Sequence, residues 1–364
     1  MRKKFDVKEF AFVPPPYGGV SVYVKRLINQ LSKDGYAVGG YYIHDKVNGE
    51  FKRLPLYDKW IWIETAKYPF KILKYIHSIA NYEIIHSHFS LEGMLYLWTF
   101  KTFCRKKIVV TVHNSMCANF LKKTNFINKF FLKVMLQSNV QWVAVSNQAK
   151  SAIESLSFKI KNPIHVIPAY IPDLCTDYAE LSSDVQLYLN QHEKNIAFYG
   201  HSFMTNGSNT DVYGFKTVIR LYSILLQNCQ SLGLVICLSD ASEIDKIAEL
   251  HKLAKECGVD DSIFWQIGAI NNIKKLWEQV HIYFRPTSTD GDSVAVREAL
   301  DEGVIVVASD VAFRPDGVIK YRYGDIKDAV DKVLLALKMP KEDKEPNMKY
   351  YEDMKRIYDS LLLR

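Results

Sequence analysis

Residues 282–310, IYFRPTSTDGDSVAVREALDEGVIVVASD, contain the pattern that decides the fold. An apolar run of strand length, 282–284, is followed by a loop of small and polar residues. A helical pattern spans 294–302, and a second apolar run, 304–308, follows Gly303. A strand, a helix and a strand in this order form the unit from which parallel sheets are built.

The same alternation of strands and helices extends in both directions along the chain. Runs rich in Val and Ile that alternate with helical patterns predict parallel sheets covered by helices. We therefore predict an α/β protein with two doubly wound, Rossmann-like domains that face a cleft. The predicted strands are residues 10–13, 38–43, 84–87, 108–112, 142–145, 165–167, 196–199, 234–238, 263–265, 282–284 and 304–308.

The alternation is interrupted once, by a segment with two prolines and a polar run. In open parallel sheets, ligands bind beyond the carboxyl ends of the strands, so functional residues are expected just after strands. The predicted parts are an N-terminal domain, 1–170, a linker, 171–194, a C-terminal domain, 195–346, and a last helix, 347–364, that packs back on the first domain.

The composition is that of a globular protein, but its positive charge is concentrated in one segment. The chain has 364 residues, 47 of them Lys or Arg and 40 Asp or Glu, which gives a net charge of +7. Residues 93–153 contain no acidic residue and nine basic ones. A local anionic partner is therefore expected. The six cysteines form no Cys-x-x-Cys pair, and no apolar run approaches the ~18 residues of a membrane span. We expect free thiols and a cytoplasmic protein.

Two loops that follow predicted strands are suited to binding a phosphate. Gly18 and Gly19 end the first loop, where they allow the backbone to approach a ligand closely before a helix begins. The loop is not Gly-x-Gly-x-x-Gly, so the nicotinamide fingerprint is absent. The second loop, 285–293, leads into a helix on which Glu298 can accept hydrogen bonds from a ribose diol. The alternatives are a simple Pro/Gly turn and a capped helix with Glu298 in solvent.

Together these segments resemble the retaining glycosyltransferases of family 4, which have the GT-B fold. The family's usual pattern is Glu-Gly-Phe-Gly-x4-Glu-Ala-x3-Gly, and most of the chain takes part in the resemblance. The residues that carry it are Asp290, Gly291, Glu298, Ala299 and Gly303, together with Gly18-Gly19, His86-Ser87-His88, Thr111-Val112-His113, Val145-Ser146 and Ile167-Pro168.

The resemblance implies a role for each matched site residue. Gly18 and Gly19 would approach the donor diphosphate, and backbone amides near Ser293 and Val294 would hold phosphate. Glu298 would bind the ribose. Asp290, beside Gly291, would face the sugar hydroxyls, and His113 would lie near them. The implied catalytic residues are His113, Asp290 and Glu298; the implied donor-binding residues are Gly18, Gly19, Arg285, Gly291, Ser293, Val294 and Glu298.

The sequence departs from the family at two positions that usually carry phosphate-binding cations. His201 stands after Gly200 where an Arg is usual, and Tyr213 stands before Gly214 where a Lys is usual. A departing nucleoside diphosphate needs its charge neutralised. We predict that Arg285 substitutes for the missing cations; Lys216, Arg297 and Arg314 are the alternatives.

Asp290-Gly291-Asp292 also reads as Asp-x-Asp, a metal-binding motif of the other large glycosyltransferase fold. Paired carboxylates beside phosphate suit a hard divalent cation. That fold has a single domain, whereas this sequence predicts two domains. We therefore expect a metal-independent donor site.

Residues 120–136, FLKKTNFINKFFLKVML, form a basic amphipathic pattern. At 100° per residue Lys122, Lys129 and Lys133 share one narrow stripe with Phe126, and apolar residues occupy the opposite face. A basic stripe that carries an exposed aromatic suits an anionic membrane surface. The alternative is a core helix whose lysines are merely solvated.

Together with the resemblance, these observations predict a retaining hexosyltransferase that moves a sugar from a nucleotide-diphosphate donor to a lipid-linked glycan in surface polysaccharide or glycoconjugate biosynthesis. Domain 1–170 would lie on the acceptor side, and domain 195–346 would bind the nucleotide sugar. We expect no cofactor besides the donor substrate and, since base-reading motifs are absent, no nucleic-acid partner. We expect a cytoplasmic protein, peripheral on the inner face of the membrane. The alternatives are a catalytically inactive homologue that binds nucleotide sugars or a partner transferase, and a nucleotide-sugar epimerase.

Overall fold

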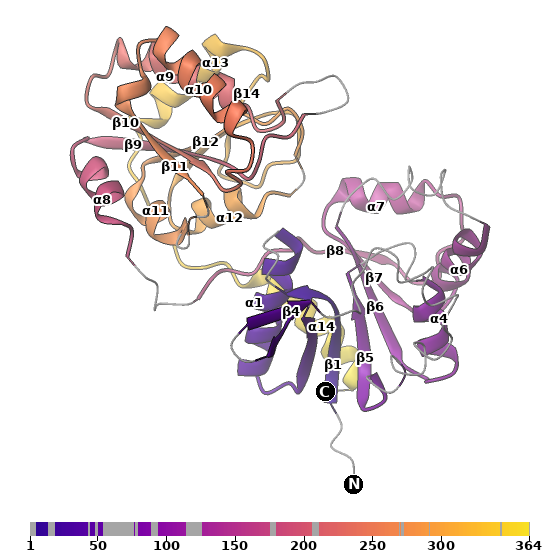
Figure 1. The fold of residues 1–364 in the computed structure, drawn as a ribbon. Coiled ribbons are helices and arrows are strands. Elements are labelled where there is room, and N and C mark those ends of the chain that lie inside the picture. Colours follow the sequence, from indigo (N-terminus) through magenta and orange to yellow (C-terminus); the bar gives the residue numbers. More distant parts are fainter. Residues whose placement is uncertain are drawn as a thin grey trace. The chain divides into compact units, whose positions relative to one another are not determined.

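The computed structural model shows two compact units, each built around a parallel sheet (Figure 1). One unit comprises Met1–Ile171 and Met348–Arg364, and the other comprises Pro172–Asn347. The predicted α/β class is confirmed. The structure describes residues 5–13, 19–42, 44–47, 50–53, 76, 79–88, 94–113, 126–174, 180–205, 211–268, 270, 273–290, 292–342 and 344–363.

The N-terminal unit contains a six-stranded sheet in the order β2-β1-β5-β6-β7-β8, with every pair parallel. β1 lies between β2 and β5, so the strand order reverses there, which is where open α/β sheets bind ligands. A short antiparallel pair, β3 (His44–Val47) and β4 (Glu50–Arg53), was not predicted. The sheet strands are β1 Phe5–Val13, β2 Val38–Tyr42, β5 Tyr82–Ser87, β6 Lys107–Val112, β7 Gln141–Ala144 and β8 Ile164–Val166.

The last helix of the chain, α14 (Lys349–Leu362), packs in the core of the N-terminal unit (Figure 1). Its buried residues Tyr351, Met354 and Tyr358 follow one another at spacings of three or four, so they share one helix face. They join a core cluster that includes Tyr23 of α1. In the part of the chain that the structure describes, this unit also contains α1 Gly19–Lys33, α4 Met94–Thr102, α6 Phe126–Leu136 and α7 Asn147–Glu154.

The C-terminal unit contains a second six-stranded parallel sheet, in the order β11-β10-β9-β12-β13-β14. The strand order reverses between β9 and β12. Its strands are β9 Lys194–Gly200, β10 Leu232–Leu238, β11 Ile263–Ile267, β12 Ile282–Arg285, β13 Ile305–Ser309 and β14 Ile319–Tyr321, and its α-helices are α8 Ser183–Asn190, α9 Phe215–Leu226, α10 Ile244–Glu256, α11 Ile273–Gln279, α12 Val294–Asp301 and α13 Ile326–Ala336.

The segment predicted as a linker, residues 171–194, is only partly one. It contains α8, whose Val185 and Leu189 are buried in the core of the C-terminal unit. The division between the units lies at Ile171 and Pro172 instead. Apolar anchoring of α8 therefore assigns most of this segment to the C-terminal unit.

Candidate active site

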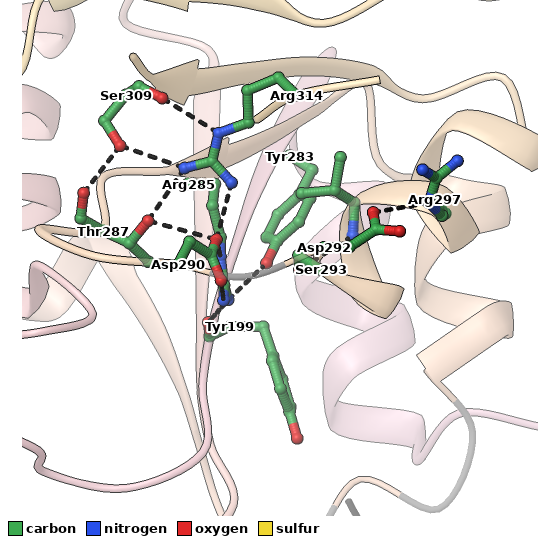
Figure 2. Close-up of polar contacts among 11 residues, drawn as sticks. Tyr199, Tyr283, Arg285, Thr287, Asp290, Asp292, Ser293, Arg297, Ser309 and Arg314 are labelled. Atoms are coloured by element: carbon green, nitrogen blue, oxygen red, sulfur yellow. Dashed lines mark hydrogen bonds and ion pairs between the residues drawn. The ribbon is translucent and has the colours of Figure 1, made fainter. Parts of the chain in front are cut away.

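The loop between β12 and α12 is organised by a buried cluster of arginine and aspartate side chains (Figure 2). Arg285 Nε lies 3.0 Å from Asp290 Oδ2 and Arg285 Nη2 lies 3.1 Å from Oδ1. Arg314 Nη1 donates to Oδ2 of the same carboxylate at 2.7 Å. The two guanidinium groups and one carboxylate leave one net positive charge at the carboxyl end of β12.

Asp290 is ionised in this cluster despite its burial. Burial opposes ionisation, but the charges and hydrogen bonds of Arg285 and Arg314 outweigh it and lower the pKa of Asp290. Thr287 Oγ1 donates a further bond at 3.3 Å. The sequence did not predict this role, in which Asp290 holds its own loop together. The contact between Asp290 and a sugar hydroxyl stays a prediction.

Arg285 also contacts the position where the family's lysine is missing. Its guanidinium carbon lies 5.3 Å from the ring centre of Tyr213, within cation–π range. Tyr213 precedes Gly214, whose φ is +83° and where a Cβ would lie 2.5 Å from Pro286 O. The start of α9 and the β12 loop therefore meet closely, and Arg285 occupies the place where they meet. This geometry favours Arg285 as the substitute cation.

Asp292, which lies just before α12, forms a separate ion pair with a residue of that helix. Arg297 Nε donates to Asp292 Oδ1 at 2.7 Å, and both side chains are about 6% exposed. A divalent ion would compete with arginines for both Asp290 and Asp292. The glycine between them, Gly291, lies outside the described residues.

The N-terminus of α12 is capped by a side chain, and its phosphate-binding role stays a prediction. The side chain of Ser293, the N-cap, accepts a hydrogen bond from Val296 N, and the helix has no acidic residue in its first turn, from Val294 onward. Such an N-terminus favours an anion.

Glu298 lies on α12 near the carboxyl ends of β9 and β10. It is half-buried. Burial raises the pKa of Tyr199, and the charge of Glu298 adds to that effect. Tyr199 belongs to β9, and its hydroxyl accepts a hydrogen bond from Ser239, which follows β10, at 3.0 Å. Glu298 is therefore close to the edge of the sheet where the strand order reverses.

A second polar cluster lies in the N-terminal unit, at the point where its strand order reverses. Glu9 of β1 is opposite His86 of β5 in the sheet register and is fully buried. Its Oε2 lies 2.9 Å from both His86 Nδ1 and His88 Nε2, and its Oε1 accepts from Tyr358 Oη at 3.0 Å. His88 Nδ1 in turn lies 3.0 Å from His113 Nε2.

The charge state of this cluster follows from its burial. Burial opposes ionisation of Glu9, but His86 and His88 outweigh it and lower the pKa of Glu9 to about 2. Burial lowers the pKa of His88 to about 4, with His86 contributing and Glu9 opposing. Burial and the neighbouring histidines lower the pKa of His113 well below its usual value. At neutral pH the carboxylate is ionised, and both His88 and His113 are neutral.

Sequence reasoning singled out His113 but missed Glu9 and Tyr358. The available signal for Glu9 was an acidic residue directly before the predicted first strand, 10–13. Among the described residues, Glu9, His86 and His88 also offer metal-ligating atoms within 4.8 Å of one another. In this structure His88 Nε2 and His86 Nδ1 each lie 2.9 Å from Glu9 Oε2.

The glycine loop and the basic helix are only partly described. Gly18 and Lys122 lie outside the described residues, and Gly19 is the exposed first residue of α1. On α6, Phe126 is 80% exposed and Lys133 is exposed, whereas Lys129 is half-buried. The membrane-binding role of this stripe stays a prediction.

The structure exposes further apolar side chains near Phe126 that were not predicted from the sequence. Ile127 and Phe130 of α6 and Phe103, which follows α4, are each at least half exposed. We call Phe103, Phe126, Ile127, Lys129, Phe130 and Lys133 the α6 surface. Among the described residues, no helix is both long enough and apolar enough to cross a bilayer.

Comparison with known proteins gives a family match and a fold. Residues 17–172 match the model of Glycosyltransferase Family 4. No curated protein sequence matches the chain. A glycosyltransferase from Rickettsia africae shares 14% identity at a TM-score of 0.69, with 99% of each chain covered.

Two further solved structures share this fold. Sucrose-phosphate synthase from Thermosynechococcus elongatus has 13% identity and a TM-score of 0.67, covering 99% of this chain and 100% of that one. HepE from Anabaena, in complex with UDP and glucose, has 11% identity and a TM-score of 0.59, covering 99% and 96%. The predicted resemblance is thus confirmed: the chain has the GT-B fold of glycosyltransferases, and its residues 17–172 match glycosyltransferase family 4.

Proposed function

We propose that the protein is a metal-independent hexosyltransferase that moves a sugar from a nucleoside-diphosphate donor to a glycan acceptor with retention of configuration. The observation that carries this proposal is the β12–α12 loop. The buried Arg285–Asp290–Arg314 cluster lies in this loop, and the loop leads into the N-terminus of α12, the helix that carries Glu298. HepE, which shares the fold, was solved with UDP and glucose, which supports a donor of this class.

The donor would bind along α12. Its diphosphate would take the first-turn amides near Ser293 and Val294 and the charge of Arg285. Glu298 is four residues after Val294, about 6 Å along the helix axis. At that separation its carboxylate would accept hydrogen bonds from the ribose next to the diphosphate.

The transfer step would depend on stabilising the departing diphosphate. Preorganised cations and helix amides can do this without reorganisation during the reaction. By resemblance to family 4, the donor's own phosphate oxygen would assist the incoming acceptor hydroxyl on the same face of the sugar, with no covalent enzyme intermediate. His113, from the N-terminal unit, would contact a hydroxyl of the transferred sugar.

The acceptor is proposed to be lipid-linked, in surface polysaccharide or glycoconjugate biosynthesis. The α6 surface supports this part of the proposal, because exposed aromatic side chains beside lysines suit the interface of an anionic membrane. The acid-free residues 93–153 surround it in sequence. The protein would then be peripheral on the inner face of the membrane.

One observation favours a second candidate, a nucleotide-sugar-binding homologue without transferase activity. His201 and Tyr213 replace the family's usual cations, and the two arginines nearest the loop already bind Asp290. Such a protein would bind the donor and release no nucleoside diphosphate.

A panel of UDP-, GDP- and dTDP-sugars tests the proposal. The transferase should be stabilised thermally by one nucleotide class, because a ligand that binds only the folded state raises its stability. It should also release the nucleoside diphosphate when a glycan acceptor is present. Binding without release supports the inactive homologue, and interconversion of one nucleotide sugar into another supports an epimerase. No binding to any member contradicts all three.

A further inference from the structure

The hydrogen bonds in the N-terminal cluster determine which nitrogen of His113 carries the proton. An ionised carboxylate only accepts hydrogen bonds, so His88 Nε2, 2.9 Å from Glu9 Oε2, must carry a hydrogen. A neutral imidazole has one N–H, so His88 Nδ1 is an acceptor. The atom 3.0 Å away, His113 Nε2, must therefore donate.

The carboxylate at the start of this chain of bonds is held rigidly. In addition to the bond from His88, its Oε1 accepts from Tyr358 Oη at 3.0 Å. His86 Nδ1 lies 2.9 Å from Glu9 Oε2 and 2.6 Å from Tyr358 Oη. His86 is held on its other side by Thr111, with 2.8 Å between His86 Nε2 and Thr111 Oγ1. Glu9 and His86 come from neighbouring strands, and Tyr358 comes from α14, so three elements fix the carboxylate.

The cluster also has a direction, from the core toward the carboxyl edge of the sheet. Glu9 lies within β1 and is fully buried, whereas His88 follows β5, His113 follows β6, and both histidines are half-buried. The rings of His88 and His113 stack at 5.2 Å, and Tyr23 of α1 lies edge-on to both. The His113 ring is thus held on several sides.

We propose that Glu9 and His88 are positioning residues for His113, holding it in the tautomer that presents an unprotonated Nδ1 as hydrogen-bond acceptor to a hydroxyl of the transferred sugar. The part of this inference that concerns the sugar rests on the proposed transferase function. The part that concerns the tautomer of His113 does not. It adds a specificity rule: the hydroxyl that meets His113 must donate a hydrogen bond. A donor sugar that lacks this hydroxyl leaves a polar nitrogen unpaired.

¹⁵N NMR of the full-length protein, labelled in its histidine rings, tests the tautomer without any assay of activity. The expected result is a neutral His113 protonated at Nε2, unchanged between about pH 6 and 8. A His113 protonated at Nδ1, or one that titrates near the ordinary value of about 6.5, overturns the proposal.

Kinetics of Glu9→Gln and His88→Asn test the consequence for the sugar. Each should lower kcat on the order of tenfold, the effect of about one hydrogen bond, while the KM for the donor is unchanged. In a series of deoxy-sugar donors, removal of one particular hydroxyl should lower the activity of the wild type. Removal of the same hydroxyl should cause no further loss of activity in the two variants. His165→Asn, a half-buried histidine of β8, is the matched control and should behave as wild type.

The possible outcomes distinguish a failure of the positioning role from a failure of the proposed transferase function. Variants that fold and keep both wild-type kcat and wild-type sensitivity to the deoxy sugars overturn the positioning role. Zinc in the purified protein at one atom per chain, lost in Glu9→Gln, overturns it in favour of a metal site. Absence of turnover by wild type with every donor counts against the transferase, and the NMR result then still decides the tautomer.

Discussion

Arg314 and Asp290, 24 residues apart, form a 2.7 Å ion pair that fastens the loop after β13 to the loop after β12. Arg314 also donates to Ser309 O at 3.0 Å and to Thr287 Oγ1 at 3.0 Å, so both loops are tied at several points (Figure 2). The shape of the proposed donor site therefore depends on a buried carboxylate that two arginines share.

Asp290→Asn should destabilise the C-terminal unit by about 3–5 kcal/mol. The amide cannot neutralise Arg285 and Arg314, which would remain buried and charged. Urea unfolding of the full chain measures the loss. The exposed Asp331→Asn on α13 is the control and should change the free energy of unfolding by less than about 0.5 kcal/mol. Equal stability of the two variants would show that the cluster contributes nothing.

Glu298→Ala should weaken donor binding while the fold survives. Hydrogen bonds from a ribose to a charged acceptor contribute about 1.5–3 kcal/mol, so the dissociation constant should rise about 10- to 150-fold. Calorimetric titration with the donor identified in the panel measures this. Glu256→Ala, an exposed glutamate that ends α10, is the control. Wild-type affinity in folded Glu298→Ala would refute the ribose assignment.

Sugar transfer should not require a divalent metal. The carboxylates of Asp290 and Asp292 are already bound by arginines, and α12 amides and Arg285 supply the positive charge. Treatment with EDTA followed by desalting should leave the transfer rate unchanged. Loss of transfer that Mn²⁺ or Mg²⁺ restores would instead assign these aspartates to a metal.

The N-terminal unit should lose stability as the pH falls below about 6.5. The pKa of His88 is about 4 when folded and about 6.5 when unfolded, so the unfolded state binds the extra proton between these values. The loss reaches about 3 kcal/mol near pH 4. His113, whose pKa is also lowered, acts in the same direction. Glu9, with a pKa of about 2 against an ordinary value near 4.5, adds a further loss at lower pH.

Pulsed hydrogen exchange measures this pH dependence in the full chain. Samples are equilibrated in urea at about pH 7 or 4.5 and labelled at one fixed pH, and peptides from β6 and β7 report the N-terminal unit. In His88→Asn the difference between the two conditions should shrink. A difference as large as in wild type would show that His88 is not its source.

Replacing Lys122, Lys129 and Lys133 with Glu should remove the protein from anionic vesicles. Each lysine near such a surface contributes about 1 kcal/mol, and salt screens it. Co-sedimentation at low salt measures binding, and transfer to a short soluble acceptor should be largely preserved. The control is Lys320, Lys327 and Lys338→Glu, three exposed lysines of the C-terminal unit. If the wild type does not sediment with vesicles, or if both triple variants lose the same amount of vesicle binding, the lysines of α6 have no membrane role and are merely solvated.

The sequence predicted most strands because the central strands of parallel sheets are buried on both faces and read as runs of Val and Ile. β14 escaped prediction because it has only three residues, Ile319–Tyr321. The first strand begins at Phe5, earlier than predicted, because its charged residues Lys8 and Glu9 are buried in the sheet. α8 was assigned to a linker because its short pattern does not reveal that Val185 and Leu189 reach a core.

The candidate site was predictable where its residues are contiguous. Ser293, Val294 and Glu298 follow from one loop and one helix. The role of Asp290 could not be predicted, because it depends on Arg314 from another loop. The role of Glu9 could not be predicted either, because its partners His88 and Tyr358 come from distant segments. The spacing of residues along the chain does not reveal such pairings.

The proposed transfer reaction can be followed by incubating the protein with its stabilising nucleotide sugar and a lipid-linked glycan acceptor, and by determining the product by mass spectrometry and ¹H NMR. We expect one added hexose per released nucleoside diphosphate, with the anomeric configuration of the donor. An acceptor left unmodified while the donor is bound, or a product of inverted configuration, would contradict it.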